Sequence, residues 1–292
     1  MRFSIVIPTY NRKDLLRRCL AAATNQDYPD YEVIVVDDGS TDGTGEMVQR
    51  EFPQVRYIRQ EPNRGPAAAR NRGIEAATGE IIAFTDDDCE PPLDWLSELA
   101  AGFERYLEAG AVGGIQEAPK AVQQHNLLAR YEQFLTRRVY GVGEHPVVGR
   151  PAPGGTNNLA VRRDLLQRLG GFDETFPVAA GEDADLLHRL ADLGYVTVCL
   201  PLKVTHHQAY TWPAFLRQQV RRGVGAAYFH RKRGEQAPLL REWLRLLATP
   251  LVFLRDLLRW RSLSMVFLRN VAACLQTWGR IQAHRRWCRE ER

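Results

Sequence analysis

Cysteine is scarce in this chain, and the few that it has show no metal-ligand spacing. The 292 residues contain five cysteines, scattered singly: Cys19, Cys89, Cys199, Cys274 and Cys288. The absence of a Cys-x-x-Cys pair argues against a zinc site, and the scatter argues against a disulfide framework. We therefore expect a reducing, cytoplasmic environment.

The sequence also lacks an apolar run long enough to cross a membrane. In the C-terminal segment the longest uncharged runs are residues 246–254 and 270–279. Both fall short of the roughly 18 residues that a spanning helix needs. The first residues lead directly into the strand-like run 3–7, so no signal peptide is expected.

Two common ligand-binding loops are missing as well. A dinucleotide-binding oxidoreductase needs Gly-x-Gly-x-x-Gly after a strand, but the first strand-like run ends in Pro-Thr-Tyr-Asn, residues 8–11. Residues 38–43 imitate the start of a calcium-binding EF-hand, but its twelfth position is Gln49, where a bidentate glutamate is needed. Both of these classes are therefore excluded.

Charge is distributed unevenly along the chain. Residues 1–202 hold 21 Lys/Arg and 30 Asp/Glu, a net charge of −9, whereas residues 203–292 hold 18 and 5, a net charge of +13. A basic segment of this kind suits nucleic acid, anionic lipid or the diphosphate of a substrate. Charge alone does not choose among these partners.

The first half of the chain alternates strand and helix patterns. The predicted strands are 3–7, 32–36, 55–58 and 81–84, and the helices between them are 13–26, 42–51 and 67–77. Further strands are predicted at 111–114, 158–161 and 196–198, and helices at 126–140, at 163–169 and from near 182. Residues 141–156 are predicted to form a long loop. This pattern is typical of a mostly parallel sheet covered on both faces, in which ligands bind beyond the carboxyl ends of the strands.

Three consecutive aspartates, Asp86, Asp87 and Asp88, follow the predicted strand 81–84 after one residue, Thr85. Carboxylates at the end of a buried strand repel one another and lose hydration, which raises their pKa unless a cation neutralises them. A hard divalent cation takes oxygen ligands and keeps positions for substrate phosphate. The alternative is a solvated acidic turn. The position after a strand, together with the polar clusters at 8–11 and 37–38, favours a metal that holds a phosphorylated ligand.

Five motifs, in order along the chain, resemble family-2 glycosyltransferases. They are residues 4–12, 35–44, 63–73, 79–88 and 171–186. The resemblance covers about residues 3–230. It implies an α/β glycosyltransferase A-type fold, Rossmann-like, with a mostly parallel mixed sheet flanked by helices and here a C-terminal helical extension. It also implies an inverting mechanism, a nucleotide-sugar donor and a divalent metal, Mn²⁺ or Mg²⁺. We expect the catalytic domain over 1–236 and the extension over 237–292.

The resemblance assigns a role to each polar cluster. Asp38 matches the aspartate that hydrogen-bonds the nucleotide base, a role that suits a carboxylate facing a pyrimidine N–H. Arg70 resembles a nucleotide or sugar contact, with a plain surface charge on a helix as the alternative. The residues expected to line the base are Pro8, Thr9, Tyr10 and Asn11.

The aspartates match the Asp-x-Asp motif of the same family. By resemblance Asp86 contacts the ribose or donor sugar, Asp88 binds the metal, and Asp87 fills the usually variable position. Because all three are acidic, the sequence leaves open which two serve, and Asp86 is counted both with the metal and with the nucleotide. His206, which follows a strand-like run, fits a position where some members carry a histidine that completes the metal shell.

Glu182 and Asp183 resemble the acidic pair that supplies the catalytic base, and Asp183 is the predicted base. Its alternative is helix capping, since acids favour the first turn. Gln218, Arg221 and Arg222 weakly resemble a Gln-x-x-Arg-Trp motif, with Arg222 in place of its tryptophan. Together with Glu182, both arginines are predicted to contact the diphosphate or the acceptor, unless they form a solvated basic face.

The C-terminal segment interleaves leucines and aromatic residues with arginines. Basic amphipathic helices of this kind lie in membrane interfaces, pack on a catalytic domain or pair in an oligomer, and these alternatives stay open. The expected partners are a nucleotide-sugar donor, by preference a UDP-sugar, a glycan or lipid-linked acceptor and an anionic membrane surface. Nucleic acid is not expected. A non-catalytic membrane adaptor with a decayed site is the alternative of a different class.

Overall fold

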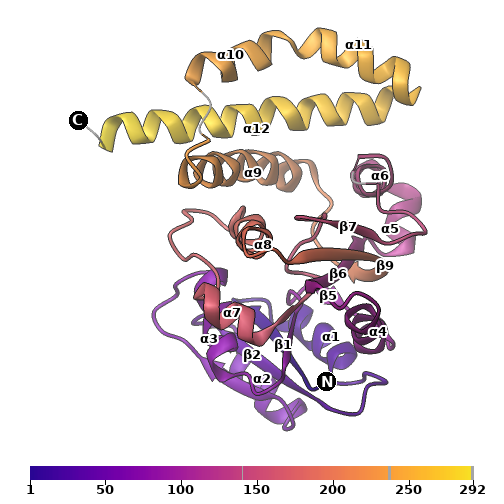
Figure 1. Cartoon of the computed structure of the whole chain (residues 1–292), viewed down its shortest axis with the longest axis vertical. Coiled ribbons are helices and arrows are strands. Elements are labelled where there is room, and N and C mark those ends of the chain that lie inside the picture. The colour runs from indigo at the N-terminus through magenta and orange to yellow at the C-terminus, as the bar shows by residue number, and fades with distance from the viewer. Residues whose placement is uncertain (140, 236–237, 291–292) are drawn as a thin grey trace. The chain divides into compact units, whose positions relative to one another are not determined.

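The computed structural model describes residues 1–139, 141–235 and 238–290 (Figure 1). The chain divides into two compact units. The first comprises Met1–His125, Leu135–Glu174 and Asp183–Gln208, and the second comprises Asn126–Phe134, Thr175–Glu182 and Ala209–Arg292. The expectation of a domain boundary at residue 236 stays a prediction.

The first half folds as the alternating pattern predicts. Its elements are β1 (Phe3–Thr9), α1 (Lys13–Ala23), β2 (Tyr31–Asp37), α2 (Thr44–Glu51), β3 (Arg56–Arg59), α3 (Pro66–Ala76) and β4 (Ile81–Phe84). The strands lie parallel in the order β3-β2-β1-β4. The apolar residues of β1 and β4, and all but Tyr31 of those of β2, are buried between helices that cover the sheet on each side, whereas Tyr57 and Ile58 of the edge strand β3 are half-buried.

The remaining strands make the sheet mixed. They are β5 (Cys89–Glu90), β6 (Ala109–Glu117), β7 (Val147–Gly149), β8 (Leu159–Arg162) and β9 (Val196–His206). Strand β8 pairs antiparallel with both β4 and β6, and β9 runs parallel to β6. The short strands β5 and β7 both pair antiparallel with β9. The predicted mostly parallel mixed sheet flanked by helices is therefore confirmed.

Three predicted segments differ from the sequence-based expectation. Strand β9 continues beyond the predicted 196–198 to His206. From Leu200 to His206 its residues alternate between buried positions and positions that are exposed or half-buried, as expected of a strand. The loop predicted over 141–156 contains β7. The helix predicted over 126–140 is α6 (Leu127–Phe134) followed by a π-helical turn, Leu135–Val139, and its last residue lies outside the described part.

The remaining helices of the first unit are α4 (Trp95–Arg105), α5 (Lys120–His125), α7 (Arg163–Leu169) and most of α8 (Glu182–Asp192). One core cluster packs residues of α1, α2 and α4 on one face of the sheet. The other packs residues of α3, α7 and α8 on the opposite face. Gly73 lets α3 approach β1 closely, since a Cβ there would lie 2.3 Å from Val6.

The second unit is helical. It contains α9 (Trp212–Lys232), α10 (Leu239–Leu247), α11 (Thr249–Trp260) and α12 (Leu263–Glu290). Helices α9 and α12 pack at close range, because a Cβ on Gly223 would lie 2.0 Å from the Gln276 carbonyl oxygen and one on Gly279 2.2 Å from the Val220 carbonyl oxygen. None of the helices in the described residues is long and apolar enough to cross a membrane.

Candidate active site

Polar side chains gather where β1, β2 and β4 end. Thr9 pairs with Asp37 in the register of β1 and β2, and the aspartate triplet follows Phe84, the last residue of β4. The Thr9 hydroxyl donates to Asp87 Oδ2 at 2.8 Å, which joins the ends of β1 and β4. The structure thus brings these predicted clusters together at one edge of the sheet.

Two arginines only partly neutralise the three aspartates. Arg12 Nη1 lies 3.1 Å from Asp87 Oδ1 and 3.0 Å from Asp88 Oδ2. Arg70 is buried, and its Nη2 donates to Asp86 Oδ1 at 2.8 Å. Three carboxylates therefore face two guanidinium groups, and this excess negative charge favours a further cation. The sequence analysis did not single out Arg12, although its place directly after the predicted base-binding residues was a usable signal.

Burial acts differently on the two inner aspartates. Desolvation raises the pKa of Asp87 to about 6, although Arg12 and the Thr9 hydroxyl favour its ionised form. Burial also opposes ionisation of Asp88, but its interaction with His206 and the charge of Arg12 outweigh this and lower its pKa. Asp88 therefore holds its negative charge more firmly than Asp87 does.

Asp88, Cys89 and His206 place one ligand atom each within 4.8 Å of one another. The pairing of β5 with β9 sets this arrangement, because Cys89 lies opposite His206 in the register. His206 Nε2 lies 3.3 Å from Asp88 Oδ1. Burial and the neighbouring aspartates raise the pKa of Cys89 well above its usual value, so its thiol stays protonated and is a poor ligand.

These donors fit a divalent metal of the kind that the sequence predicts. A carboxylate suits Mn²⁺ or Mg²⁺, and an imidazole suits first-row transition metals, so Asp88 with His206 favours Mn²⁺. Asp86 is not part of that group in the described residues, since its carboxylate pairs with Arg70. We expect Asp86 to act on the nucleotide side of the site.

Asp38 holds the loop that precedes α3. Its Oδ1 accepts from Gln60 Nε2 at 2.7 Å and from the Arg64 amide at 2.9 Å, and its Oδ2 accepts from the Gly65 amide at 2.7 Å. Gly65 immediately precedes α3, which carries Arg70. Asp38 is therefore a positioning residue for α3, and its contact with a base stays a prediction.

The loop after β1 is tied to the loop after β2. The Asn11 amide donates to Ser40 Oγ at 2.8 Å, and Asn11 Oδ1 accepts from the Thr41 amide at 2.7 Å. Asn11 adopts a positive φ of 52°, a conformation that asparagine tolerates better than most residues. This turn leaves Tyr10 48% exposed, whereas Pro8 and Thr9 are buried. Of the four predicted base-lining residues, Tyr10 and Asn11 are exposed.

The predicted base, Asp183, lies in the first turn of α8. Its Oδ1 accepts from the Ala184 amide at 2.8 Å, and its Oδ2 lies 3.6 Å from the position that a Cβ on Gly155 would take. The Thr85 hydroxyl, next to the aspartate triplet, donates to the Asn157 carbonyl oxygen at 3.1 Å. The loop at 155–157 therefore lies beside Asp183 and hydrogen-bonds the residue that follows β4, and the role of Asp183 as the base stays a prediction.

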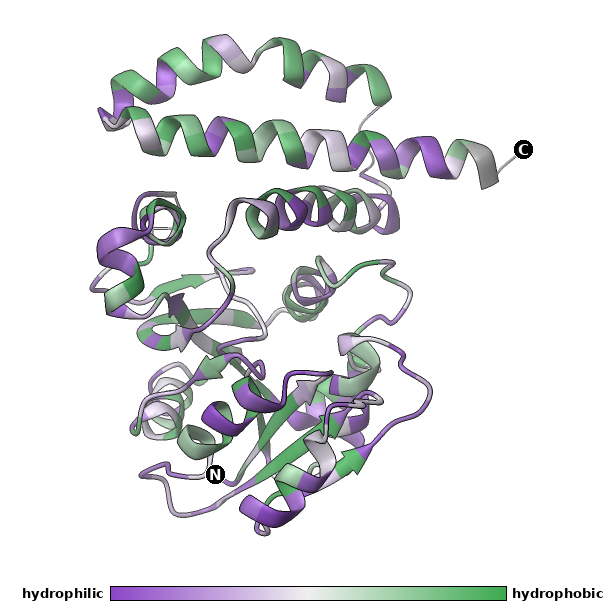
Figure 2. Cartoon of the chain, turned by 180° about the vertical axis from the view of Figure 1, so that it is seen from behind, coloured by the Kyte–Doolittle hydropathy of each residue, from purple (hydrophilic) through white to green (hydrophobic). Residues whose placement is uncertain are grey.

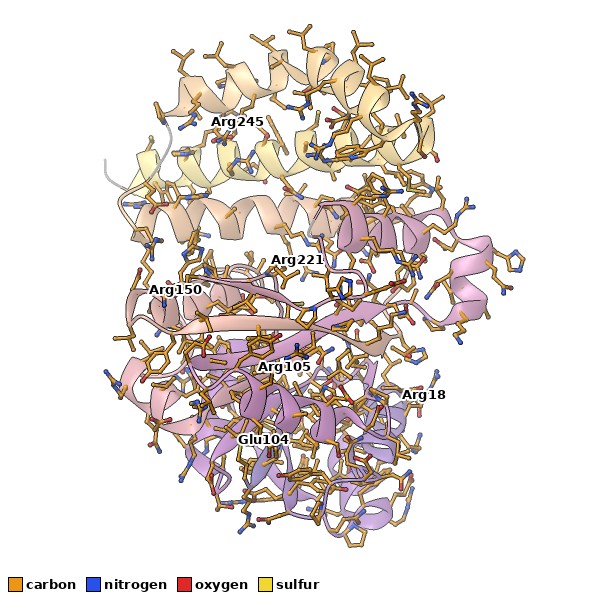
Figure 3. All side chains as sticks on the ribbon, turned by 45° about the vertical axis from the view of Figure 1, so that its right-hand side comes forward. Arg18, Glu104, Arg105, Arg150, Arg221 and Arg245 are labelled. Carbon is orange, nitrogen blue, oxygen red and sulfur yellow. The ribbon has the colours of Figure 1, made fainter. Side chains whose placement is uncertain are left out.

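Two other predicted residues lie on α9. Arg221 and Arg222 belong to the second compact unit, and Arg221 is exposed there (Figure 3). Glu182, the first residue of α8, is buried. The predicted contacts of these three residues with a diphosphate or an acceptor stay predictions.

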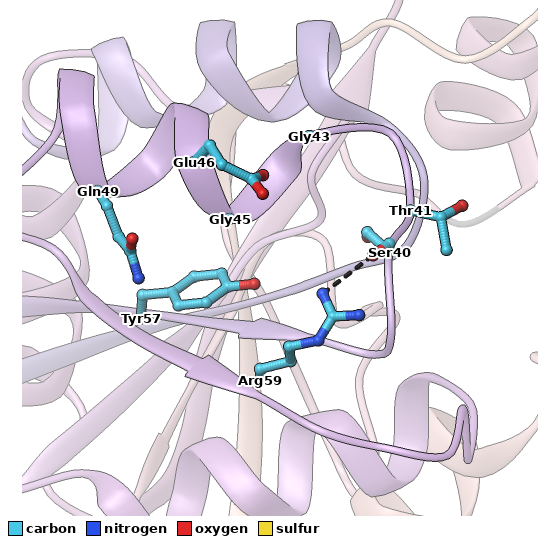
Figure 4. A pocket seen from close by; sticks show the side chains of 8 residues that line it. All are labelled: Ser40, Thr41, Gly43, Gly45, Glu46, Gln49, Tyr57 and Arg59. Carbon is cyan, nitrogen blue, oxygen red and sulfur yellow. Dashed lines mark hydrogen bonds between the residues drawn. The ribbon is translucent and has the colours of Figure 1, made fainter.

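An open pocket of about 380 Å³ lies beside the loop that follows β2 (Figure 4). Within it Arg59 donates to the Ser40 carbonyl oxygen at 2.9 Å. Gly45 leaves room for Tyr57, whose hydroxyl donates to the fully buried Asp37 at 2.5 Å. None of the predicted site residues lines this pocket. The hydrogen bonds of Arg59 and Tyr57 fix the walls of this pocket and support the loop after β2, which Asn11 contacts.

Comparison with known proteins matches this chain to the model of "Glycosyl transferase family 2" over residues 4–170. It is 31% identical over 229 residues to "Glycosyltransferase AglE" of Haloferax volcanii, which covers 76% of this chain and 72% of that protein. It is 28% identical over 186 residues to the "Glucosyl-dolichyl phosphate glucuronosyltransferase" of the same organism, which covers 59% of this chain. The chain spans 56% of the length of that second relative.

A solved structure shares the fold along nearly the whole chain. The "Mannosyltransferase PcManGT from Pyrobaculum calidifontis in complex with GDP-Man and Mn2+" superimposes with a TM-score of 0.64 over 97% of this chain and 84% of that one, at 24% identity. At this identity the likeness shows the glycosyltransferase A-type fold. With the family match and the archaeal relative, it confirms the resemblance on which the sequence analysis relied. The chain belongs to glycosyl transferase family 2 and is a glycosyltransferase.

Proposed function

We propose that this protein is an inverting, metal-dependent glycosyltransferase. It moves a sugar from a nucleoside diphosphate donor, a UDP-sugar by preference, to a hydroxyl group of a glycan or lipid-linked acceptor. The observation that carries the proposal is the under-neutralised aspartate triplet, with Asp88 beside His206. The Mn²⁺ and GDP-mannose bound to the mannosyltransferase of the same fold support it.

The donor's diphosphate is the ligand that this edge of the sheet suits best. Asp88 and His206 would hold the metal, which supplies positive charge to the diphosphate as it leaves. Arg12 and Arg70 add fixed positive charge to the same cluster. Preorganised charges of this kind stabilise the negative charge that develops on the leaving group. Tyr10 offers an exposed ring for the base.

Asp183 is the proposed general base. It takes the proton of the acceptor hydroxyl while the acceptor oxygen forms its bond to the anomeric carbon. On the opposite side of that carbon the bond to the diphosphate oxygen breaks, and the nucleoside diphosphate leaves with both bonding electrons. Attack opposite the leaving group inverts the anomeric configuration. General bases contribute about 10²–10⁴ in rate.

A lipid-linked acceptor is supported by the names of relatives. One similar protein is named for its action on glucosyl-dolichyl phosphate. The strongly basic C-terminal segment suits an acceptor at an anionic surface. The alternative function, a non-catalytic adaptor, is disfavoured, because the family membership and the paired Asp88 and His206 both favour an enzyme.

The test replaces Asp183 with Asn and measures two quantities. Transfer to an acceptor is expected to fall by about 10²–10⁴, while the affinity for a nucleoside diphosphate with Mn²⁺ stays within about twofold. The matched control is Asp164→Asn, an exposed acid in the first turn of α7, which should transfer normally. Near-normal turnover by Asp183→Asn would show that the base is another residue. A panel of nucleotide sugars, scored by donor hydrolysis, identifies the donor.

A further inference from the structure

Helices α10 and α11, residues 239–260, follow one another end to end and pack along α12 within the second unit, so they form one arm of a helical hairpin whose other arm is α12 (Figure 1). Figure 2 shows apolar and polar residues interleaved along both helices. A helix on the surface of a water-soluble protein buries its apolar side and exposes its charges. The α10–α11 arm does the opposite, because its acidic residues are buried and many of its leucines are exposed to solvent.

Both acidic residues of the α10–α11 arm, Glu242 and Asp256, are buried against α12. Glu242 is 1% exposed, and its Oε2 accepts from Arg280 Nε at 2.7 Å, while Arg245 donates to Oε1. Asp256 is fully buried between Arg255, at 2.8 Å, and Arg269 of α12. The inner side of the α10–α11 arm is therefore held by ion pairs as well as by apolar packing.

The outer side carries a continuous stripe of leucines at intervals of three and four residues. All six are between 54% and 76% exposed in the described chain: Leu240, Leu244, Leu247, Leu251, Leu254 and Leu258. Residues at this spacing share one face of a helix. An apolar stripe over two successive helices marks an interaction surface, in contrast to single scattered leucines.

The charges around the stripe have one sign. Residues 238–262 contain two acids, the buried Glu242 and Asp256, and all other charges there are arginines. The exposed arginines are Arg241, Arg245, Arg255, Arg259 and Arg261. Arg245, labelled in Figure 3, is one that also braces Glu242. The surface on offer is thus apolar and cationic, without exposed acidic groups.

A second copy of the chain fits this surface poorly. Intervals of four and three residues are those of a coiled-coil seam, which relies on opposite charges at the flanking positions. Here Arg241 and Arg255 flank the seam on one side, and Trp243, Pro250 and Leu257 flank it on the other. Pairing of two such faces brings no acid against these arginines. An anionic bilayer supplies both an apolar interior and negative head groups.

We propose that the outer face of the α10–α11 arm docks on an anionic lipid surface, with both helices lying in the interface and the six leucines in the acyl region. The proposal deepens the proposed function, because it names the surface on which a lipid-linked acceptor is met. It rests on its own observations, since the α10–α11 arm would dock in the same way whatever sugar the enzyme transfers.

The test is flotation of the full-length protein with vesicles of phosphatidylcholine alone and with 30% phosphatidylglycerol, about the anionic fraction at which basic segments bind. The double variant Leu247→Gln/Leu251→Gln removes two of the most exposed leucines and should bind anionic vesicles at least about tenfold more weakly. The variant Arg241→Gln/Arg259→Gln should lose most of the preference for anionic over neutral vesicles, and so should the wild type at 1 M salt.

The matched control is Leu93→Gln/Leu107→Gln, which removes two leucines of the first unit that are 56% and 78% exposed and should float like the wild type. Equal flotation of Leu247→Gln/Leu251→Gln and the wild type would overturn the proposal, and so would failure of the wild type to float. A concentration-dependent dimer that this variant abolishes would assign the face to a second copy. Binding of Mn²⁺ and UDP is measured on every variant, so a failure of docking stays distinct from a failure of the proposed function.

Discussion

Asp88 at the edge of the sheet and Asp256 in the helical hairpin are both buried aspartates that face arginine, yet they belong to opposite kinds of environment. At the sheet edge, three carboxylates share Arg12 and Arg70. In the hairpin, one carboxylate is braced by two arginines, Arg255 and Arg269.

The ratio of cations to carboxylates separates a site from a structural support. At the sheet edge, burial together with the neighbouring charges of Asp88 and Asp86 raises the pKa of Asp87 to about 6. Where arginines outnumber acids, the carboxylate is neutralised within the fold. At Glu242 burial opposes ionisation, but the hydrogen bonds and charges of Arg280 and Arg245 outweigh it and lower the pKa. We expect the first arrangement to bind a cation, whereas the second is complete without one.

The largest expected effect is on catalysis at the under-neutralised cluster. Asp88→Asn removes the carboxylate nearest His206, so transfer should fall by about 10²–10³ or more and Mn²⁺ should no longer bind to the nucleotide-free protein. The thermal midpoint should change little. Asp14→Asn, an exposed acid on α1, serves as the control. Retention of Mn²⁺ affinity by Asp88→Asn would break the comparison at its catalytic end.

The next effect is on stability at the over-neutralised hairpin. Asp256→Asn leaves the guanidinium groups of Arg255 and Arg269 without their buried carboxylate, which should cost about 3 kcal/mol in the unfolding of the helical unit. Denaturant titration followed by circular dichroism measures it, and Mn²⁺ affinity should stay unchanged. An Asp256→Asn protein as stable as the wild type would show that these ion pairs do not support the hairpin.

A smaller effect appears in the pH dependence of the metal-free protein. The pKa of Asp87 is about 6 in the folded state, against an ordinary value of 3.8, so its stabilising contribution is complete below pH 4 and is lost as pH rises through 6. Relative to Asp87→Asn, the wild type should therefore lose about 1 kcal/mol of stability between pH 5 and pH 7.5. Denaturant titrations of both proteins in EDTA at both pH values measure this difference. Parallel pH profiles would mean that Arg12 neutralises Asp87 fully.

The smallest effect sharpens the role of Arg12. Its guanidinium lies between Asp87 and Asp88, where it competes with any added cation. Arg12→Gln should therefore bind Mn²⁺ about threefold more tightly in the absence of nucleotide. Free Mn²⁺ measured by electron paramagnetic resonance reports this affinity. Arg18→Gln, which breaks an exposed ion pair with Glu90, should leave the affinity unchanged, and weaker binding by Arg12→Gln would mean that Arg12 organises the carboxylates for the metal.

The alternation of strands and helices predicted much of the first unit. Strand β4 begins and ends where the apolar run 81–84 does, and the triplet follows it because charged residues cannot continue a strand buried on both faces. The cluster at this edge was predictable for the same reason, since parallel strands place their carboxyl ends together.

Long-range pairing was beyond the reach of the sequence pattern. Cys89 lies opposite His206 because β5 pairs antiparallel with β9, and no local periodicity reports a partner more than 100 residues away. The role of Asp38 in holding the Gly65 amide and the bridge made by Arg12 are equally non-local. In the hairpin, the arginines were visible in the sequence, but the burial of Asp256 depends on Arg269 in the next helix.

The most direct measurement is calorimetric titration of the full-length protein with UDP, and in parallel with GDP, in Mn²⁺ and in EDTA. We expect at least one nucleotide to bind with Mn²⁺, to bind far more weakly in EDTA, and to lose its Mn²⁺ dependence in Asp88→Asn. Equal nucleotide affinity with and without Mn²⁺ in the wild type, or binding of neither nucleotide, would contradict the claim that the sheet-edge aspartates recruit a cation for a nucleoside diphosphate.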